Sequence, residues 1–251
     1  MVSGTSRRIA VPMVFACLGV LGAAEAAHAA GGLSVTPAIL ERGARMGNVG
    51  SLTLNNTTNE TLRVTVNVRP WRQELNGKVI ADARATYNRY VRATRRSFTI
   101  RAGAKVPVNF RMVRRTPSGS LYGSVDILGK PTRTKGRKGI IPQYRLISSL
   151  RLHPGKKTLK LRTGAGQIRN RTFVLPVRNL GNTIEPISGT YRLSGPGSRS
   201  GSFKSVSVVP GKLVTMGLTS TSGFKKGRYT LTASLSQGSK RFNVRTSVTL
   251  R

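Results

Sequence analysis

The clearest structural signal in this 251-residue chain is the stretch Leu62-Arg63-Val64-Thr65-Val66-Asn67-Val68-Arg69-Pro70-Trp71. Apolar and polar residues alternate from Leu62 to Arg69, and Pro70 follows them. This period of two places the apolar side chains on one face of a β-strand and the polar ones on the other. The stretch therefore predicts a strand that ends at Pro70, in an antiparallel sheet with a dry inner face and a cationic outer face.

Similar strand signals surround this stretch. Ser51–Leu54 also alternates, and the polar residues 55–60 between the two runs predict a hairpin-like pair. Asn76-Gly77 predicts a tight turn. Further strands are expected at Leu33–Leu40, Ser97–Ile100, Val106–Met112, Ser120–Leu128 and Tyr144–Leu152. Ala81–Arg96 should be irregular, and Gly129–Gly139 should be a mobile connection rich in lysine and arginine.

A turn at His153-Pro154-Gly155 divides the chain, and the second half has the same pattern of short alternating runs separated by turn residues. Strands are expected there at Thr158–Arg162, Arg171–Asn179, Gly189–Leu193, Phe203–Val209, Lys212–Leu218, Arg228–Ser236 and Lys240–Leu250. Short strands separated by turn residues at this spacing are typical of a β-sandwich. We therefore predict an all-β protein of two tandem immunoglobulin-like β-sandwich domains, at residues 33–153 and 156–251, after an N-terminal signal-peptide helix at residues 1–30.

The N-terminus has the three regions of a secretory signal peptide. Arg7-Arg8 precedes an apolar run from Ile9 to Ala24, and Ala27-His28-Ala29 supplies small residues for cleavage after Ala29 or Ala30. Both the general and the twin-arginine export routes fit this segment. Cleavage would remove Cys17, the only cysteine, and no later apolar run is long enough to span a membrane. We expect a periplasmic or extracellular, surface-associated protein without disulfides or a membrane anchor.

The charge is extreme. Lysine and arginine total 43 against 7 aspartates and glutamates, which gives a formal net charge of +36. Such a field favours anionic partners, and the candidate polyanion-binding residues are Arg95, Arg96, Arg114, Arg115, Arg133, Lys135, Arg137 and Lys138. Nucleic acid should bind only non-specifically, because aromatic residues for base stacking make up only 6% of the chain. An anionic envelope polymer or lipid headgroup is the expected partner, and a merely solubilising surface is the other interpretation.

Catalytic residues are nearly missing. After export His153 would be the only histidine, and it stands beside a turn with no acidic residue near it in sequence, which indicates a surface turn residue. Cysteine and histidine ligands for a metal, nucleophile motifs and phosphate-binding loops are also lacking. We expect no enzyme activity, no cofactor, no metal and no catalytic residue.

The strand predicted at Tyr144–Leu152 has a second interpretation. Tyr144, Leu146 and Leu150 alternate onto one face, so that this strand is a candidate edge for pairing with an extended peptide. The other interpretation is that these residues fill the core of their own domain.

Several of these stretches resemble a known family. Leu33-Ser34-Val35-Thr36-Pro37, residues 51–56, Leu62–Trp71 and Phe98–Met112 are similar, in this order, to the N-terminal domain of periplasmic pilus chaperones of the PapD type. Leu121–Val125, Gln143–Leu146 and the second predicted sandwich also resemble the paired domains of WxL-interacting surface proteins. Pilus chaperones hold a subunit's terminal carboxylate with two basic residues, and by position only Arg151 matches one of them. The WxL-interacting resemblance implies peptidoglycan and partner binding.

Together these features favour an exported, non-enzymatic binding or scaffold protein that associates with anionic cell-wall polymers or surface partners. The alternative is a periplasmic pilus-type chaperone that binds subunits by β-strand donation, with Tyr144, Leu146, Leu150 and Arg151 as the candidate partner-binding residues.

Overall fold

A computed structural model describes residues 32–251 of the chain. The expected signal peptide, with its helix and Cys17, lies outside the described residues. Residues 32–251 form β-strands and turns without a helix, so no helix in this range is long and apolar enough to cross a membrane. The strands make two β-sandwiches in sequence, each with a hydrophobic core of its own, as the strand signals predict.

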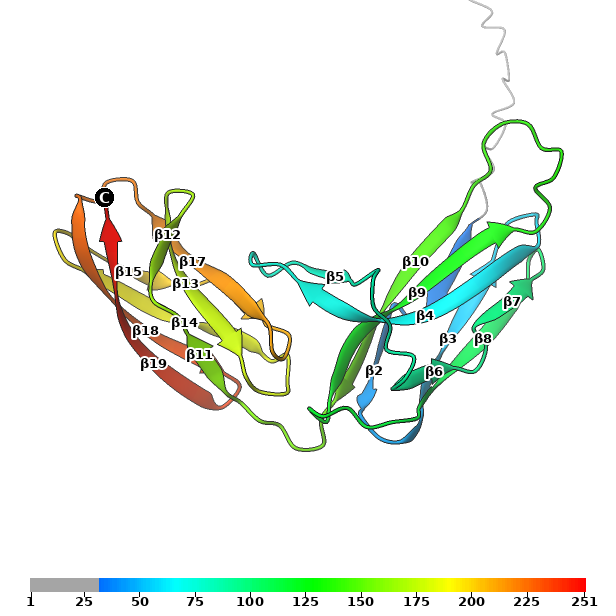
Figure 1. Ribbon diagram of the computed structural model, residues 1–251, viewed down its shortest axis with the longest axis horizontal. Helices are drawn as coiled ribbons and strands as arrows, with labels where there is room; N and C mark the ends of the chain where they lie inside the picture. The colour runs from blue at the N-terminus through cyan, green and yellow to red at the C-terminus, as the bar shows by residue number, and fades with distance from the viewer. Residues whose placement is uncertain (1–31) are drawn as a thin grey trace, which may run out of the picture. The chain divides into compact units, whose positions relative to one another are not determined.

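The first sandwich contains ten strands in two sheets (Figure 1). One sheet has the order β1-β3-β8-β6, and the other has the order β2-β10-β9-β4-β5 with β7 also paired to β4. The strands are β1 (Leu33–Thr36), β2 (Ile39–Gly43), β3 (Gly47–Asn56), β4 (Leu62–Gln73), β5 (Val79–Ala81), β6 (Val91–Ala93), β7 (Ser97–Ile100), β8 (Lys105–Met112), β9 (Leu121–Pro131) and β10 (Tyr144–His153).

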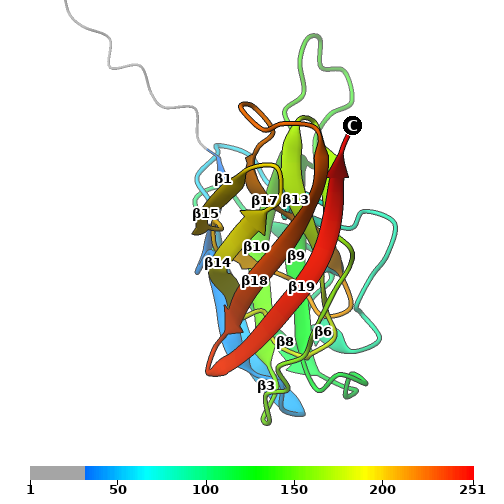
Figure 2. The ribbon, with the colours of Figure 1, turned by 90° about the vertical axis from the view of Figure 1, so that its left-hand side faces the viewer.

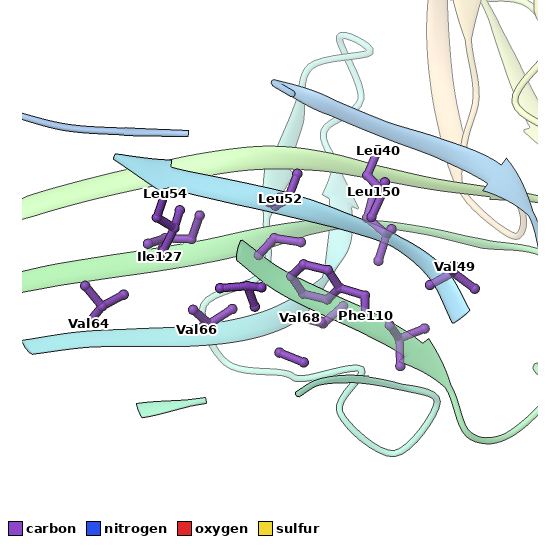
Figure 3. Close-up of a cluster of buried hydrophobic side chains, with 14 of the residues drawn as sticks. Leu40, Val49, Leu52, Leu54, Val64, Val66, Val68, Phe110, Ile127 and Leu150 are labelled. Atoms are coloured by element: carbon purple, nitrogen blue, oxygen red, sulfur yellow. The ribbon is translucent and has the colours of Figure 1, made fainter. Parts of the chain in front are cut away.

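Strand β4 has the dry face that its alternation predicts. Leu62, Val64, Val66 and Val68 are all at most 1% exposed. They pack against side chains from the facing sheet, including Leu52 and Leu54 of β3 and Phe110 of β8 (Figure 3). Because burial of each such side chain contributes about 1.5–3 kcal/mol, this row is a main source of the stability of the first sandwich.

Two predictions about this region are wrong. Strand β3 does not form a hairpin with β4: β3 pairs with β1 and β8 in one sheet, whereas β4 pairs with β9 in the other. Nor does Pro70 end the strand, because β4 continues to Gln73. The missing N–H of Pro70 falls just beyond the end of the β4–β5 ladder at Trp71 and Ala81, where the Pro70 carbonyl still accepts a hydrogen bond from Asp82 N at 2.8 Å. The tight turn at Asn76-Gly77 then joins β4 to β5.

The connection between β3 and β4 crosses from one sheet to the other around a buried side chain. Asn56 is fully buried, and its Nδ2 donates to the carbonyl oxygens of Glu60, Ile100 and Arg101 at 2.8–3.1 Å. The second sandwich has the same arrangement at the buried Asn179, whose Nδ2 donates to the carbonyls of Thr183 and Val208. Each asparagine thus satisfies main-chain acceptors where a strand leaves its sheet.

The second sandwich also has two sheets. One has the order β11-β13-β12 with β17 paired to β13, and the other has the order β15-β14-β18-β19 with β16 paired to β14. Figure 2 shows β14, β18 and β19 side by side. The strands are β11 (Leu161–Thr163), β12 (Gln167–Arg169), β13 (Thr172–Asn179), β14 (Pro186–Ser194), β15 (Ser198–Ser202), β16 (Val206–Ser207), β17 (Leu213–Ser220), β18 (Gly227–Gln237) and β19 (Lys240–Leu250).

Most strands expected in the second half are present, but their limits differ. The strand expected at Phe203–Val209 is reduced to β16, and β12 and β15 lie where no strand was expected. Phe203 and Val208 are nevertheless buried in the core, together with Phe173 and Tyr229. The alternation of this segment therefore reflects side-chain burial rather than a continuous hydrogen-bonded ladder.

On the outer face of the β9–β4 sheet, one buried carboxylate joins three strands. Asp126 of β9 accepts hydrogen bonds from Arg69 Nε of β4, at 2.6 Å, and from Arg145 Nε of β10, at 2.9 Å. Burial raises the pKa of Asp126, but the hydrogen bonds and charges of Arg145 and Arg69 outweigh it and lower the pKa below its usual value.

Replacing Asp126 with asparagine is expected to lower the free energy of unfolding by about 1–3 kcal/mol at neutral pH, because two guanidinium groups lose their carboxylate partner. A lowered folded-state pKa stabilises the fold above the unfolded-state value, about 3.9, and the gain is lost as the pH falls through the folded-state pKa. The difference between wild type and variant should therefore disappear in acid, measured by urea unfolding. Asp82→Asn is the control, since Asp82 makes no ion pair within residues 32–251.

Candidate partner-binding edge and cleft

Part of β10 is hydrogen-bonded to a strand on one side only. Strand β9 pairs with β10 from Tyr144 to Leu152. On the other side, β2 pairs in parallel with Ser149–His153, and its register stops there. Among the described residues no strand is hydrogen-bonded to the first half of β10 on this side, although β1 of the other sheet lies close to β10. We name residues 145–148 the open edge.

The chain between β1 and β2 explains why the open edge exists. Strand β1 pairs with β3 in one sheet, and β2 pairs with β10 in the other, so the chain changes sheets at Pro37 and Ala38. Ser148 marks the crossing point, because its buried hydroxyl donates to Ala38 O at 2.9 Å and to Pro37 O at 3.2 Å. Before Ala38 the chain is still part of the other sheet as β1, so it does not pair with the residues of β10 that precede Ser148.

The main-chain groups at the open edge can be assigned from the register. Ser149 N donates to Ala38 O, so residue 149 points its N–H and C=O toward β2. Because these groups alternate along a strand, Arg145 and Ile147 point theirs to the same side. An extended peptide laid along this edge would find the main-chain donors and acceptors of two residues available for a ladder.

The candidate partner-binding side chains are divided between two faces of β10. Tyr144 and Leu146 are partly buried against the first core, and Leu150 is fully buried there. Leu150 and Arg151 also lie on the half of β10 that β2 already pairs. Ile147 was not singled out from the sequence, but it points to the outer face and is 54% exposed. The open edge therefore presents Ile147 and the main chain rather than Leu150.

A cleft of 640 Å³ begins on this outer face. Strand β10 contributes Ile147, Arg151 and His153, β4 contributes Trp71, and Ile184 and Val209 come from the second half of the chain. Apolar walls with a few charged groups are typical of sites that bind an extended or small ligand. The cleft and the open edge share Ile147, so one elongated ligand could contact both.

The charged groups of the cleft form a connected cluster. Arg151 Nη1 lies 3.7 Å from Glu41 Oε2, and its guanidinium lies 6.0 Å from the centre of the Trp71 ring. Within residues 32–251 the Nε of Arg151 is buried and has no acceptor. Arg151 is thus held in place by weak contacts, and its charge is incompletely neutralised, which suits an anionic group of a ligand.

His153 is not the isolated surface residue that the sequence indicates. Its Nε2 lies 2.6 Å from Glu41 Oε1, and its ring contacts Tyr122 edge-on at a centroid distance of 5.7 Å. Burial raises the pKa of Tyr122, against hydrogen bonds that lower it, so its hydroxyl stays protonated at neutral pH. Trp71 stacks on Tyr122 and donates from Nε1 to Ser124 Oγ at 2.8 Å. These contacts hold Trp71, Ser124 and His153, which line the cleft.

The eight candidate polyanion-binding residues are all exposed, but they lie in three separate connections. Arg95 and Arg96 are between β6 and β7, Arg114 and Arg115 follow β8, and Arg133, Lys135, Arg137 and Lys138 are between β9 and β10. Only Arg137 makes an ion pair within the described part of the chain, with Glu60 at 2.9 Å. The last four thus share one connection, whereas the other two pairs lie in two different ones.

Comparison with known proteins defines the fold. No protein-family model matches the sequence, and no curated protein sequence matches it. Among solved structures, a chain of the chaperone–tip adhesin complex in CFA/I fimbriae biogenesis has a TM-score of 0.54 and 9% identity, over 85% of this chain and 98% of that one. The class 5 fimbriae chaperone CfaA has a TM-score of 0.52 and 9% identity, over the same shares.

The chain therefore has the two-domain immunoglobulin-like fold of PapD-like fimbrial chaperones, and the PapD resemblance predicted from the sequence is confirmed at the level of fold. The first of these two structures is described as a complex that contains a chaperone, and the second as a chaperone. Within residues 32–251 no group of histidine, cysteine, aspartate and glutamate side chains is arranged to hold a metal ion.

Proposed function

We propose that this protein is a periplasmic chaperone of the pilus type that binds an extended segment of a protein subunit at the open edge of β10. The observation that carries the proposal is the pairing of β10, since β2 covers Ser149–His153 and no described strand is hydrogen-bonded to the main chain of Arg145 and Ile147 on this side. The likeness of fold to fimbrial chaperones supports it. The subunit would pair with this edge as an added strand.

The cleft next to the open edge extends the proposed site. Arg151 lines the cleft, its charge is incompletely neutralised, and the PapD resemblance implies a basic residue at this place that holds the subunit's terminal carboxylate. Charge-assisted hydrogen bonds of arginine to a carboxylate are short and directional, so Arg151 would fix the register of the added strand. The apolar walls, with Trp71 and Ile147, would cover the subunit's last side chains.

Capture from the bacterial envelope tests the proposal. A tagged protein purified in about 1 M salt, where the Debye length is only about 3 Å, should retain one subunit in a fixed molar ratio. Ile147→Pro should lose this partner and Ile147→Thr should keep it. A partner retained equally by both variants would contradict strand addition.

Arg151→Gln is expected to weaken subunit binding by about tenfold to a hundredfold, the value of a charge-assisted hydrogen bond to a carboxylate. The measurement is the dissociation constant for the captured subunit with its free C-terminus. The control is the same subunit with an amidated C-terminus, to which wild type and variant should bind equally. An unchanged constant for the free C-terminus would remove Arg151 from the site.

A second candidate function, attachment to an anionic cell-wall polymer, is favoured by one observation. Seven of the eight candidate polyanion-binding residues are exposed without an acidic partner among residues 32–251. Such binding depends on counterion release and should be lost as salt rises, so that sedimentation with wall material at low salt, and release at high salt, separates it from subunit capture.

A further inference from the structure

The loop between β9 and β10 concentrates positive charge beyond the ends of these strands. It runs over residues 132–143, and we name it the basic loop; Figure 1 shows it extending past the strand ends. Its exposed cations are Arg133, Lys135, Arg137 and Lys138. Only Arg137 has an acidic partner, Glu60, in the described chain, so three of the four charges remain unpaired.

The strands below the basic loop add to this field. Arg63 of β4 stands directly opposite Lys130 of β9, and both are exposed. Paired residues of an antiparallel ladder point to the same face, and like charges placed there destabilise the sheet. No acidic side chain pairs with either residue within residues 32–251. A bound surface with many negative charges would therefore stabilise this end of the first sandwich.

One apolar side chain at the basic loop separates the possible anionic partners. Ile140 is 97% exposed, the highest value among the large hydrophobic residues described. A hydrated wall polymer offers such a side chain no apolar surroundings, whereas a lipid bilayer does. Cations flanking an exposed apolar residue fit the boundary between headgroups and acyl chains.

We propose that the basic loop binds the surface of an anionic lipid bilayer, with its cations among the headgroups and Ile140 inserted below them. Ile140 lies outside the open edge in sequence, because β10 begins at Tyr144, and Pro142 between them lacks the N–H that an added strand would need. Membrane attachment would leave the open edge and the cleft to the subunit. The proposal does not depend on the chaperone function.

Binding to vesicles of phosphatidylglycerol and phosphatidylcholine tests the proposal without any subunit. All variants are made in the same full-length chain, so that residues 1–31 contribute equally. Ile140→Ser is expected to lower the partition coefficient about tenfold, the effect of losing one inserted aliphatic side chain. The double variant Lys135→Gln with Lys138→Gln is expected to lower it about twentyfold or more at low salt, at roughly fivefold for each cation.

Two matched controls make the result decisive. Ile147→Ser removes an isoleucine that is 54% exposed but lies on β10, and it should leave vesicle binding unchanged. Heparin, a soluble polyanion, should bind wild type and Ile140→Ser equally. The proposal is overturned if anionic vesicles do not bind above neutral ones, if Ile140→Ser behaves like wild type, or if Ile140→Ser weakens subunit capture while vesicle binding is unchanged.

Discussion

Substitution of Ile147 by proline is expected to reduce affinity for the subunit by more than a hundredfold and to leave the protein folded. Proline removes the N–H of residue 147 and places its ring where a partner strand would pair. Because the N–H and C=O of Ile147 point away from β9, no hydrogen bond within the sandwich is lost, and the cost to the fold is limited to local strain. A binding isotherm with the captured subunit measures the effect.

Ile147→Thr is the matched control for this variant. Threonine is also β-branched and keeps the main-chain N–H, so it should lose only the apolar contact, about tenfold in affinity. Equal losses for proline and threonine would show that the side chain carries the affinity and that no strand is added.

Val66→Asp is expected to unfold the first sandwich. Val66 is 1% exposed between the two sheets of this sandwich, and a carboxylate there would lose its hydration without gaining a partner. The loss should exceed about 4 kcal/mol, a large fraction of the stability of a typical domain. The single tryptophan of the chain, Trp71, lies in the first sandwich, so that its fluorescence reports the unfolding of this unit during a urea titration.

Thr65→Asp introduces the same carboxylate one residue earlier in β4. Thr65 is exposed on the outer face, and the expected loss is below about 1 kcal/mol, within the range of strand propensities. Similar losses at both positions would mean that the alternation of β4 does not divide a dry face from a wet one.

The fold could be predicted from the sequence where the signal is local. The alternation from Leu62 to Val68 defines β4, and the turn at Asn76-Gly77 defines its hairpin with β5, because each depends on a few adjacent residues. The sheet in which a strand pairs depends on contacts between distant residues. Asn56 bonds to main-chain oxygens 44 and 45 residues away, so the chain crosses between sheets where a hairpin was expected.

The candidate site was less predictable for the same reason. Tyr144–Leu152 was identified as an edge candidate, but the half that β2 covers could not be known without the sheet change at Pro37. Glu41 and His153 are 112 residues apart in the sequence, so their contact carried no local signal. Ile147 has the wrong phase to belong to the apolar row of β10, and this same phase is what exposes it beside the cleft.

Hydrogen exchange at the main-chain amides of Arg145 and Ile147 is the direct test of strand addition at the open edge. In the free protein these amides face the open edge and should exchange rapidly, whereas the amide of Ser149, which donates to Ala38, should be protected. On binding of the captured subunit, strand addition predicts that the amides of Arg145 and Ile147 become as protected as the amide of Ser149. A complex in which the subunit is bound and these two amides exchange as fast as before would contradict it.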